Sequence, residues 1–333
     1  MLVPKPIRAA FRGSLRALAD RYTPLQAQLV VTRRCNLSCG YCNEYDDYSP
    51  PIPFETLRER VDHLAKLGTV VLTFTGGEPL LNPRLDDVTS HATSKGMVCT
   101  SITNGYPINR TWIQRLNKAG LTLLQVSIDN LEPNELSQKS WERLRKKLEL
   151  LREHAKFSVN VNAVLGSCTP DETRILVRAV REMGFYQTVG LMHDGNGQII
   201  SGLVGDEALP AFYEEIHDLS RKSIFHHFGE GWEREMLQEG TSPWKCRAGA
   251  RYLYVDELGA VSYCSQRRGD PGIPLLEYGR EDLVREWHLP KGCEDRCTIG
   301  CVRRASAIDE WRSQDGKAGR SRQRLVSLSI GKN

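Results

Sequence analysis

Three cysteines stand within eight residues in the stretch CNLSCGYC, as Cys35, Cys39 and Cys42. Cysteine thiolates are ligands for zinc and for iron-sulfur clusters. A closed zinc site takes four ligands, and the stretch that follows, NEYDDYSPP, offers carboxylates but neither Cys nor His. Three thiolates on a 4Fe-4S cube leave one iron without a protein ligand. The spacing therefore favours a cluster site with one open position, and zinc is the alternative.

Five further cysteines form a second group near the C-terminus. Disulfide frameworks are typical of small secreted proteins, whereas this chain has 333 residues and no export signal. We therefore predict metal binding for both groups. Cys99 and Cys168 stand apart, and we interpret them as ordinary buried or loop cysteines. The second group is Cys246, Cys264, Cys293, Cys297 and Cys301.

Short β-rich runs alternate with helical patterns from residue 27 to residue 193. In the segment 54–67, for example, Leu57, Val61 and Leu64 fall on one helical face. Another helix is expected after Thr169, which can form a capping box with Glu172. Six such β/α steps predict a parallel sheet covered by helices, either open and doubly wound or closed in part as a barrel. The expected strands are 28–32, 70–75, 98–103, 123–129, 157–165 and 188–193.

The unusual residues follow the ends of these strands. The cysteine triplet follows the first strand, TGGEP the second and TNG the third, while SIDN closes the fourth. Active residues of parallel α/β folds gather at the C-terminal ends of strands, so the sequence predicts one active edge of the sheet. His193 and Asp194 follow the sixth strand, and for them we favour a solvated loop pair over a role in proton transfer.

The motif Cys35-x3-Cys39-x2-Cys42, with Tyr41 before the last cysteine, resembles the cluster motif of radical S-adenosylmethionine (SAM) enzymes. TGGEP at 75–79 strengthens the resemblance, because members carry a similar stretch after their second strand. The resemblance implies an α/β fold with a partial (β/α)6 TIM-like barrel, and a 4Fe-4S cluster whose open iron is chelated by SAM. The reduced cluster would cleave SAM to a 5′-deoxyadenosyl radical, which abstracts hydrogen from a substrate.

The same resemblance implies contacts with SAM. Gly76, Gly77 and Glu78 would bind its methionyl amino group, and glycine lets the backbone approach a ligand closely. Tyr41 would lie near the adenine. Polar residues at the next strand ends are further expected contacts, with helix caps or turn residues as the alternative. These residues are Asn104, Ser127 and Asp129.

Cys246 and Cys264 stand in the pattern C-x12-G-x4-C through Gly259, which resembles the opening of SPASM and twitch extensions. In those extensions a β-hairpin carries two ligands of an auxiliary 4Fe-4S cluster, and YVDELGAVSYC fits such a hairpin. The full SPASM pattern has seven cysteines and two auxiliary clusters, whereas five suffice for one cluster and a spare thiol. A zinc knot is the alternative. The remaining ligands would come from Cys293, Cys297 and Cys301, and the spacing does not identify the spare one.

Charge and composition divide the chain into four expected parts. They are an N-terminal amphipathic segment (1–24), the radical SAM core (25–240), a small cysteine-rich auxiliary-cluster domain (241–311) and a basic, flexible tail (312–333). The net charge of +4 comes from the two ends, and residues 25–311 carry a net negative charge. A nucleic-acid-binding core is therefore not indicated.

The N-terminal segment places Ile7, Phe11, Leu15 and Leu18 at helical spacing, with arginines alongside. Such a helix could rest on an anionic membrane surface, but we favour packing across the barrel. No apolar run approaches the roughly 20 residues of a membrane span. A cytoplasmic protein is the default expectation.

Three hypotheses about function follow. We favour a radical SAM enzyme that oxidises or cross-links a peptide or small metabolite, with an auxiliary cluster that handles electrons and with flavodoxin or ferredoxin as the electron donor. The second hypothesis is a radical SAM enzyme that acts on a membrane lipid. The third is a metal-binding interaction or redox protein that does not cleave SAM. We expect a peptide substrate to be recognised by the barrel, by the C-terminal part or by a separate partner.

Overall fold

The computed structural model describes residues 15–219 and 231–309, in which nine strands form one sheet with the order β6-β5-β4-β3-β2-β1-β7-β8-β9. The first six strands are parallel, each to its neighbours. This arrangement confirms the predicted parallel sheet. The strands are β1 (Gln26–Thr32), β2 (Val71–Gly76), β3 (Val98–Thr103), β4 (Leu123–Ser127), β5 (Ser158–Leu165) and β6 (Tyr186–Leu191).

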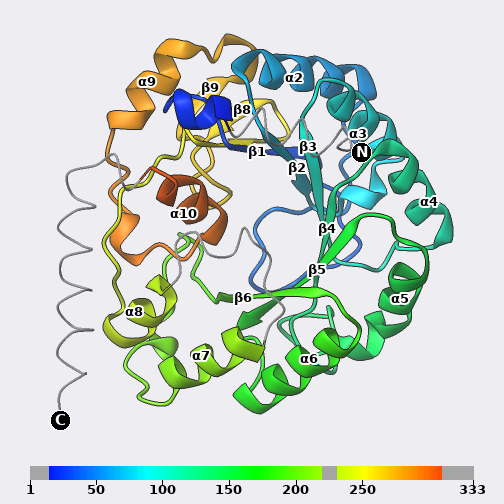
Figure 1. Ribbon diagram of the computed structural model, residues 1–333, viewed down its shortest axis with the longest axis vertical. Coiled ribbons are helices and arrows are strands. Elements are labelled where there is room, and N and C mark those ends of the chain that lie inside the picture. Colours follow the sequence, from blue (N-terminus) through cyan, green and yellow to red (C-terminus); the bar gives the residue numbers. More distant parts are fainter. Residues whose placement is uncertain (1–14, 220–230, 310–333) are drawn as a thin grey trace.

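Amphipathic helices connect these strands and cover the outer face of the curved sheet (Figure 1). The 54–67 helix has the predicted bounds, and the predicted capping box at Thr169 and Glu172 is present. The partial (β/α)6 barrel is therefore confirmed. The helices are α2 (Phe54–Leu67), α3 (Leu85–Ser94), α4 (Arg110–Ala119), α5 (Trp141–His154), α6 (Pro170–Glu182) and α7 (Leu209–Leu219).

The two faces of the sheet differ in polarity. Because side chains alternate along a strand, Leu29, Leu72 and Phe74 all point outward and are fully buried in the main hydrophobic core. The alternate positions face the interior of the barrel and are largely polar, as in the hydrogen bond of 2.8 Å between Thr73 Oγ1 and Thr100 Oγ1. The interior is thus lined for polar ligands, while the outer face supplies the core.

The C-terminal region extends the same sheet instead of forming a second one. β7 pairs in parallel with β1, and β8 and β9 follow in antiparallel order. The predicted hairpin is confirmed, with Gly259 in its turn at φ 88°. The division at residue 240 stays a prediction. The elements are α8 (Trp232–Glu239), β7 (Tyr252–Val255), β8 (Ala260–Ser262), β9 (Pro271–Pro274), α9 (Arg280–His288) and α10 (Gly300–Ala307), and the short 3-10 helices are η1 (Pro79–Leu81), η2 (Ser201–Leu203), η4 (Leu275–Glu277) and η5 (Glu294–Arg296).

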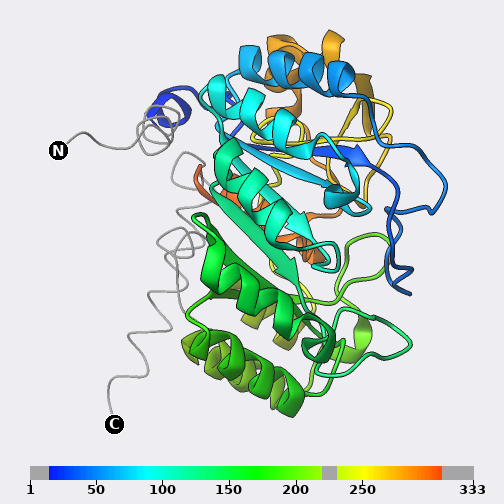
Figure 2. The same cartoon turned by 90° about the vertical axis from the view of Figure 1, so that its right-hand side faces the viewer.

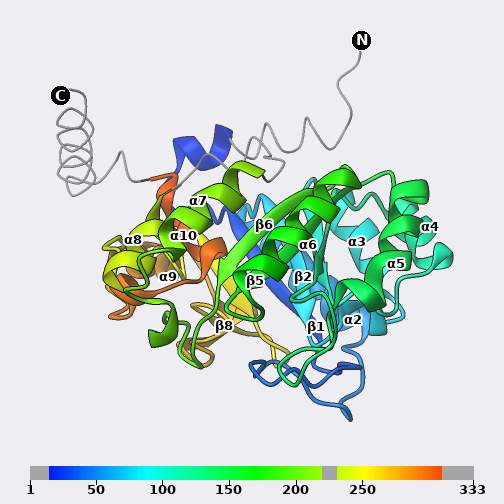
Figure 3. The ribbon, with the colours of Figure 1, turned by 90° about the horizontal axis from the view of Figure 1, so that it is seen from below.

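Loops gather at the end of the barrel toward which the strands run (Figure 2). The loop after β1 and the loop after β4 lie together at this end, whereas the helix at residues 15–19 lies at the opposite end (Figure 3). Leu15 is 51% exposed and Leu18 is 44% exposed, while Ala17 is buried. These two leucines are thus exposed, whereas Ala17 packs on the barrel, and the packing predicted for the whole amphipathic segment stays a prediction.

Ile7 and Phe11 lie outside the described residues, as does the basic tail. Their predicted roles are untested. No helix in the described parts of the chain is long and apolar enough to cross a membrane.

A fully buried arginine joins the two ends of the described chain. The Arg251 guanidinium donates to both carboxylate oxygens of Asp309, at 2.5 and 2.8 Å. It also donates to the carbonyl oxygens of Ala17 and Thr23, each at 2.7 Å. Buried ion pairs are costly to break because the remaining charge stays unpaired.

Arg251→Met should lower the free energy of unfolding by about 3–5 kcal/mol, because it leaves Asp309 charged and buried. Arg280→Ala is the matched control, since Arg280 pairs with Asp20 but is 57% exposed, and an exposed pair contributes about 0–1 kcal/mol. Urea denaturation of both variants measures the difference. Equal losses would contradict the role given to Arg251.

Candidate functional site

The loop that follows β1 carries the cysteine triplet and is closed by backbone hydrogen bonds. Cys35 N donates to Asp46 O at 2.8 Å, and Asp46 N donates to Arg33 O at 3.0 Å. Cys42 N donates to Cys39 O at 3.0 Å. All three thiols are half-buried. The loop thus presents them together at the end of β1.

Gly76 and Gly77 allow the second strand to touch this loop. A Cβ atom on Gly76 would lie 2.1 Å from Thr32 O, and one on Gly77 would lie 2.2 Å from Arg33 O. Gly77 N donates to Thr32 O at 2.8 Å. From the sequence we expected these glycines to let the backbone approach a ligand, whereas here they approach the chain's own backbone. A contact between these glycines and SAM stays a prediction.

The Glu78 side chain is fully buried and is held by the ends of two strands. Its carboxylate accepts hydrogen bonds from Leu80 N at 3.0 Å, Thr103 Oγ1 at 2.8 Å and Asn104 N at 2.7 Å. Burial raises the pKa of Glu78 to about 7, although the three donors favour the ionised form. Because the chain's own donors already bind this carboxylate, Glu78 joins the end of β2 to the end of β3.

Asn104, a predicted site residue, contacts a thiol of the triplet. Its Nδ2 atom is 3.6 Å from Cys35 Sγ and donates to Asn36 Oδ1 at 2.8 Å. The end of β3 therefore reaches the cysteine loop directly. The sequence did not predict this link to the thiol, because no local pattern reports a contact between residues this far apart.

Tyr41 and Asp129 meet each other in a buried polar cluster. Tyr41 donates to Asp129 Oδ2 at 2.5 Å, and Ser137 Oγ donates to the same oxygen at 2.7 Å. Lys139 Nζ lies 3.1 Å from this oxygen and also contacts the Tyr41 hydroxyl. The cluster binds the loop after β4 to the cysteine loop. Sequence analysis missed Ser137 and Lys139, since the stretch that contains them has no motif.

Ser127 ends β4 and is paired in register with Asn162 of β5. Next to it, the interior face carries a chain of amides and hydroxyls. Asn160 Nδ2 donates to Thr188 Oγ1 at 3.0 Å, and Thr188 donates to Asn162 Oδ1 at 2.7 Å. The alternation of asparagine with valine in SVNVNAVL is a signal that could have identified this lining.

His193 and Asp194 lie in a turn, in which His193 is half-buried and Asp194 is exposed. Asp194 Oδ1 accepts from Asn196 N at 2.8 Å and from Gln198 N at 3.0 Å, and the His193 ring lies 2.8 Å from Asp194 O. The favoured interpretation as a solvated loop pair agrees with these contacts.

The second cysteine group converges beside the β7–β8 hairpin. Cys246, Cys264 and Cys297 are buried, and Cys293 and Cys301 are half-buried. In the described residues, no three His, Cys, Asp or Glu side chains converge closely enough to hold a single metal ion. A 4Fe-4S cluster is larger than a single ion and takes more widely spaced thiols.

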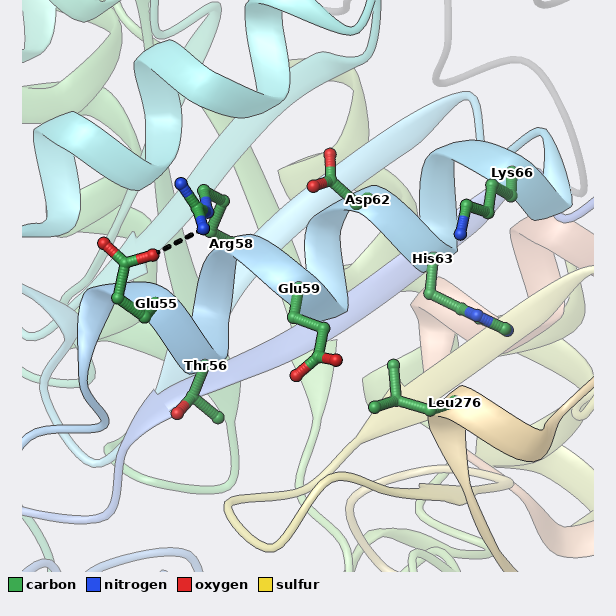
Figure 4. Close-up of a pocket in the computed structure, with 8 residues that line it drawn as sticks. All are labelled: Glu55, Thr56, Arg58, Glu59, Asp62, His63, Lys66 and Leu276. Atoms are coloured by element: carbon green, nitrogen blue, oxygen red, sulfur yellow. Dashed lines mark ion pairs between the residues drawn. The ribbon is translucent and has the colours of Figure 1, made fainter.

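A cavity of about 580 Å³ lies away from both cysteine groups, on the outer side of α2 (Figure 4). Its charged side chains include an ion pair of 2.7 Å between Arg58 and Glu55. None of the predicted site residues lines it, so we do not assign it to the cofactor. Its lining is Glu55, Thr56, Arg58, Glu59, Asp62, His63, Lys66 and Leu276.

The chemistry of the triplet fits a cluster. Burial raises the pKa of Cys42 to about 11 and also raises the pKa of Cys35, so both thiols stay protonated in the metal-free chain and would lose their protons on binding metal. Asp129 Oδ1 is buried and has no hydrogen-bond partner within the described residues. An acceptor for a ligand is therefore present beside the loop.

A partial α/β barrel with a three-thiol loop at its C-terminal edge defines a class of enzyme that binds a cluster and a nucleoside cofactor there. The family model of the radical SAM superfamily matches residues 29–195, which is half of the chain. The chain belongs to this superfamily and is a radical SAM enzyme. The family implies a 4Fe-4S cluster and SAM as cofactors.

Two kinds of relative share sequence with the chain. The AdoMet-dependent heme synthase of Methanosarcina barkeri is 26% identical over 324 residues, which covers 83% of this chain and 90% of the relative. The PqqA peptide cyclase of Xanthomonas oryzae pv. oryzae is 33% identical over 119 residues, but only 33% of this chain and 30% of the relative are covered.

Solved structures share the fold at low identity. SuiB of Streptococcus suis bound to its precursor peptide SuiA has a TM-score of 0.62 at 14% identity, with 92% of this chain and 77% of that chain covered. Native anSMEcpe with bound AdoMet and the Cp18Cys peptide has a TM-score of 0.55 at 19% identity, with 84% and 88% covered. These likenesses confirm the fold.

Gly77→Ala should destabilise the metal-free protein by about 1–3 kcal/mol, because its methyl group would overlap the carbonyl oxygens of Arg33 and Arg34. Gly202→Ala is the control, since nothing lies within 4 Å of a Cβ atom there, and its effect should stay within about 0.5 kcal/mol. Urea denaturation measures both. Equal stability of the two variants would contradict the tight contact.

Glu78 should make the stability of the metal-free protein depend on pH. Its pKa is raised in the folded state, from the ordinary 4.5 to about 7, so its stabilising contribution is complete below the unfolded pKa and is lost as pH rises through the folded pKa. The loss should be on the order of 3 kcal/mol between pH 4.5 and pH 8. Glu78→Gln should remove this slope, and parallel curves of unfolding free energy for both proteins would disprove it.

Proposed function

We propose that the chain binds a 4Fe-4S cluster through Cys35, Cys39 and Cys42 and holds SAM at the adjoining strand ends. The observation that supports this proposal is the meeting of three strand ends on one loop. Gly77 packs on the loop backbone, and Asn104 lies beside the first thiol. When bound, the cluster and SAM supply a 5′-deoxyadenosyl radical that abstracts hydrogen from the substrate.

The chain's own residues orient and enclose these groups. We propose that the backbone at Gly76, Gly77 and Glu78 binds the methionyl amino group, and that Asn104 and Ser127 donate hydrogen bonds to SAM. Asp129 Oδ1, which is buried and has no hydrogen-bond partner in the described part of the chain, is the proposed acceptor for SAM. The Tyr41 ring lies in the loop between two ligands, and its hydroxyl is anchored on Asp129. The ring is thereby kept in place beside the site, where the adenine is expected.

We propose an auxiliary 4Fe-4S cluster in residues 241–311, held by the second cysteine group. Flavodoxin or ferredoxin is the proposed electron donor. The two groups are close in the fold, because Asn43 Nδ2 donates to Gln266 Oε1 at 3.0 Å. Asn43 follows Cys42, and Gln266 is two residues after Cys264. A substrate in the barrel could therefore pass an electron to the auxiliary cluster after losing hydrogen.

We propose a peptide as the substrate and oxidation or cross-linking as the outcome. The names of PqqA peptide cyclase and of SuiB with its precursor peptide support this class. The hydrogen-bonded side chains of Asn160, Thr188 and Asn162 on the interior face also suit a peptide substrate, because amides and hydroxyls can pair with both donors and acceptors of a peptide backbone.

An iron porphyrin is the second candidate substrate. A relative whose match covers 83% of this chain is named a heme synthase. The broad apolar ring of an iron porphyrin would gain little binding energy from the carboxamide lining of the barrel interior, so we favour the peptide. A membrane lipid has weaker support, because the exposed Leu15 and Leu18 lie at the end of the barrel opposite the cysteine loop.

Reduced, reconstituted protein should convert SAM to 5′-deoxyadenosine under anaerobic conditions. Cys42→Ala should lower the product to the level of a protein-free control, because it removes a proposed cluster ligand. Cys168→Ala should leave it unchanged, since Cys168 contacts Thr173 and belongs to neither group. Chromatography of the nucleoside products measures both. Equal product from all three proteins would disprove the proposed function.

Deuterated substrates separate the candidate classes. Transfer of deuterium from a peptide into 5′-deoxyadenosine, with loss of two hydrogens from the peptide mass, is the expected result. Transfer from an iron coproporphyrin alone would favour the second candidate instead.

A further inference from the structure

The cysteine loop, residues 33–53, joins β1 to α2 and contains neither a helix nor a strand. Such a loop takes its shape from the contacts that its backbone and side chains make with neighbouring elements. Gly77, next to the end of β2, packs against its first residues. A second set of contacts comes from the C-terminal part of the chain, and it centres on Glu257 in the turn of the β7–β8 hairpin.

Glu257 receives one arginine on each of its carboxylate oxygens. Arg33 Nη1 donates to Oε1 at 3.2 Å, and Arg268 Nη2 donates to Oε2. The three side chains are only 21–24% exposed. Exposed ion pairs contribute little on their own, whereas partly buried pairs that share a network contribute more. Glu257 therefore ties the start of the cysteine loop to the loop after β8.

The interactions continue from both arginines back to the cysteine loop. Arg33 Nε lies 3.6 Å from Asp46 Oδ2. Arg268 Nη1 donates to Tyr254 Oη at 3.2 Å, and the Tyr254 hydroxyl donates to Glu44 Oε1. The series thus begins and ends in the cysteine loop, and we call it the hairpin clamp. Its members, in order, are Asp46, Arg33, Glu257, Arg268, Tyr254 and Glu44.

The two ends of the hairpin clamp lie beside the triplet in the chain. Asp46 O accepts from Cys35 N at 2.8 Å, and the Asp46 carboxylate accepts from Ser49 N at 2.9 Å. Glu44 is two residues after Cys42. The hairpin clamp therefore holds the chain on both sides of the triplet, and a change at Glu257 reaches both.

The hairpin turn is itself held in place. Arg60 of α2 is 7% exposed and donates to Asp256 O at 3.2 Å and to Glu257 O at 3.0 Å. Ala260 N donates to Asp256 Oδ1 at 2.8 Å. Glu257 is therefore presented from a fixed turn. Leu258, the next residue, is 84% exposed and supplies a control in the same turn.

We propose that Glu257 is a positioning residue for the SAM site, which through Arg33 and Arg268 holds the cysteine loop in the conformation that binds SAM. This role rests on the SAM site proposed above. It makes that site depend on the C-terminal hairpin and not on the barrel alone. Because coupling between two parts of a protein is reciprocal, SAM bound at the cysteine loop should in turn stabilise the loop that carries Arg268.

Hydrogen exchange of the metal-free full chain tests the hairpin clamp without any cofactor. Glu257→Gln removes the charge but keeps the size of the side chain. It should speed amide exchange in residues 35–47 about three- to tenfold, because both arginines lose their ion pair. Leu258→Gln should leave this exchange unchanged, as should the charge-matched control Glu149→Gln, whose pair with Arg145 is exposed on α5. Unchanged exchange in β3, β4 and β5 checks that each variant is folded.

Binding of SAM to the reconstituted full chain tests the consequence for the site. Glu257→Gln should raise the Kd of SAM about tenfold at unchanged iron content, because a binding conformation that is populated less often binds more weakly in proportion. Arg33→Gln should have a similar effect. The double variant should bind SAM no more weakly than either single variant, since both changes break the same interaction. Equilibrium dialysis measures the Kd.

The possible results separate the hairpin clamp from the SAM site. Equal exchange in Glu257→Gln and Leu258→Gln would overturn the hairpin clamp. Faster exchange with an unchanged Kd of SAM, or additive effects in the double variant, would overturn the positioning role of Glu257. If the unaltered reconstituted chain bound no SAM, the proposed SAM site itself would be refuted, and the exchange measurement would still decide whether the hairpin clamp holds the cysteine loop.

Discussion

The contact between Gly76 and Gly77 and the backbone at Thr32 and Arg33 is the constraint on which the site depends. The two segments of the chain approach so closely that a Cβ atom on either glycine would lie about 2 Å from a carbonyl oxygen. Gly77 N and Glu78 N then donate to Thr32 O and Arg34 O, at 2.8 and 2.9 Å. The cysteine loop is thereby fixed to the second strand. A loop held by the sheet in this way can present three thiols in a reproducible arrangement before any cluster binds.

Two buried carboxylates extend this support to the neighbouring strands. Glu78 gathers the ends of β2 and β3, and Asp129 gathers Tyr41 and the loop after β4. Burying a carboxylate costs free energy unless its oxygens are hydrogen-bonded, so each of these carboxylates favours the conformation in which its donors stay in place. Asp129 keeps one oxygen without a partner in the described residues, and an acceptor of this kind is suited to a bound ligand.

The continuous sheet relates the two cysteine groups. β7 pairs directly with β1, so the strand before the triplet and the strand after Cys246 are neighbours. Tyr254 on β7 contacts Glu44 in the triplet loop, and Tyr252 on the same face contacts Cys301. One strand thus reaches both sites from the interior of the barrel. With both proposed clusters bound, a substrate between them would lie next to a source of radical chemistry and next to an electron acceptor, as oxidation or cross-linking requires.

The sequence by itself determined the strands, the helix at 54–67, the capping box at Thr169 and the hairpin around Gly259, because periodicity, caps and turn glycines act locally. It also placed the triplet and TGGEP at one edge, since parallel strands end together. Only the tertiary structure decided that Glu78 joins two strands, that Lys139 and Ser137 complete the Tyr41 cluster, and that the C-terminal strands extend the first sheet. These features depend on contacts between residues far apart in the chain, and pairing of that kind leaves no local pattern.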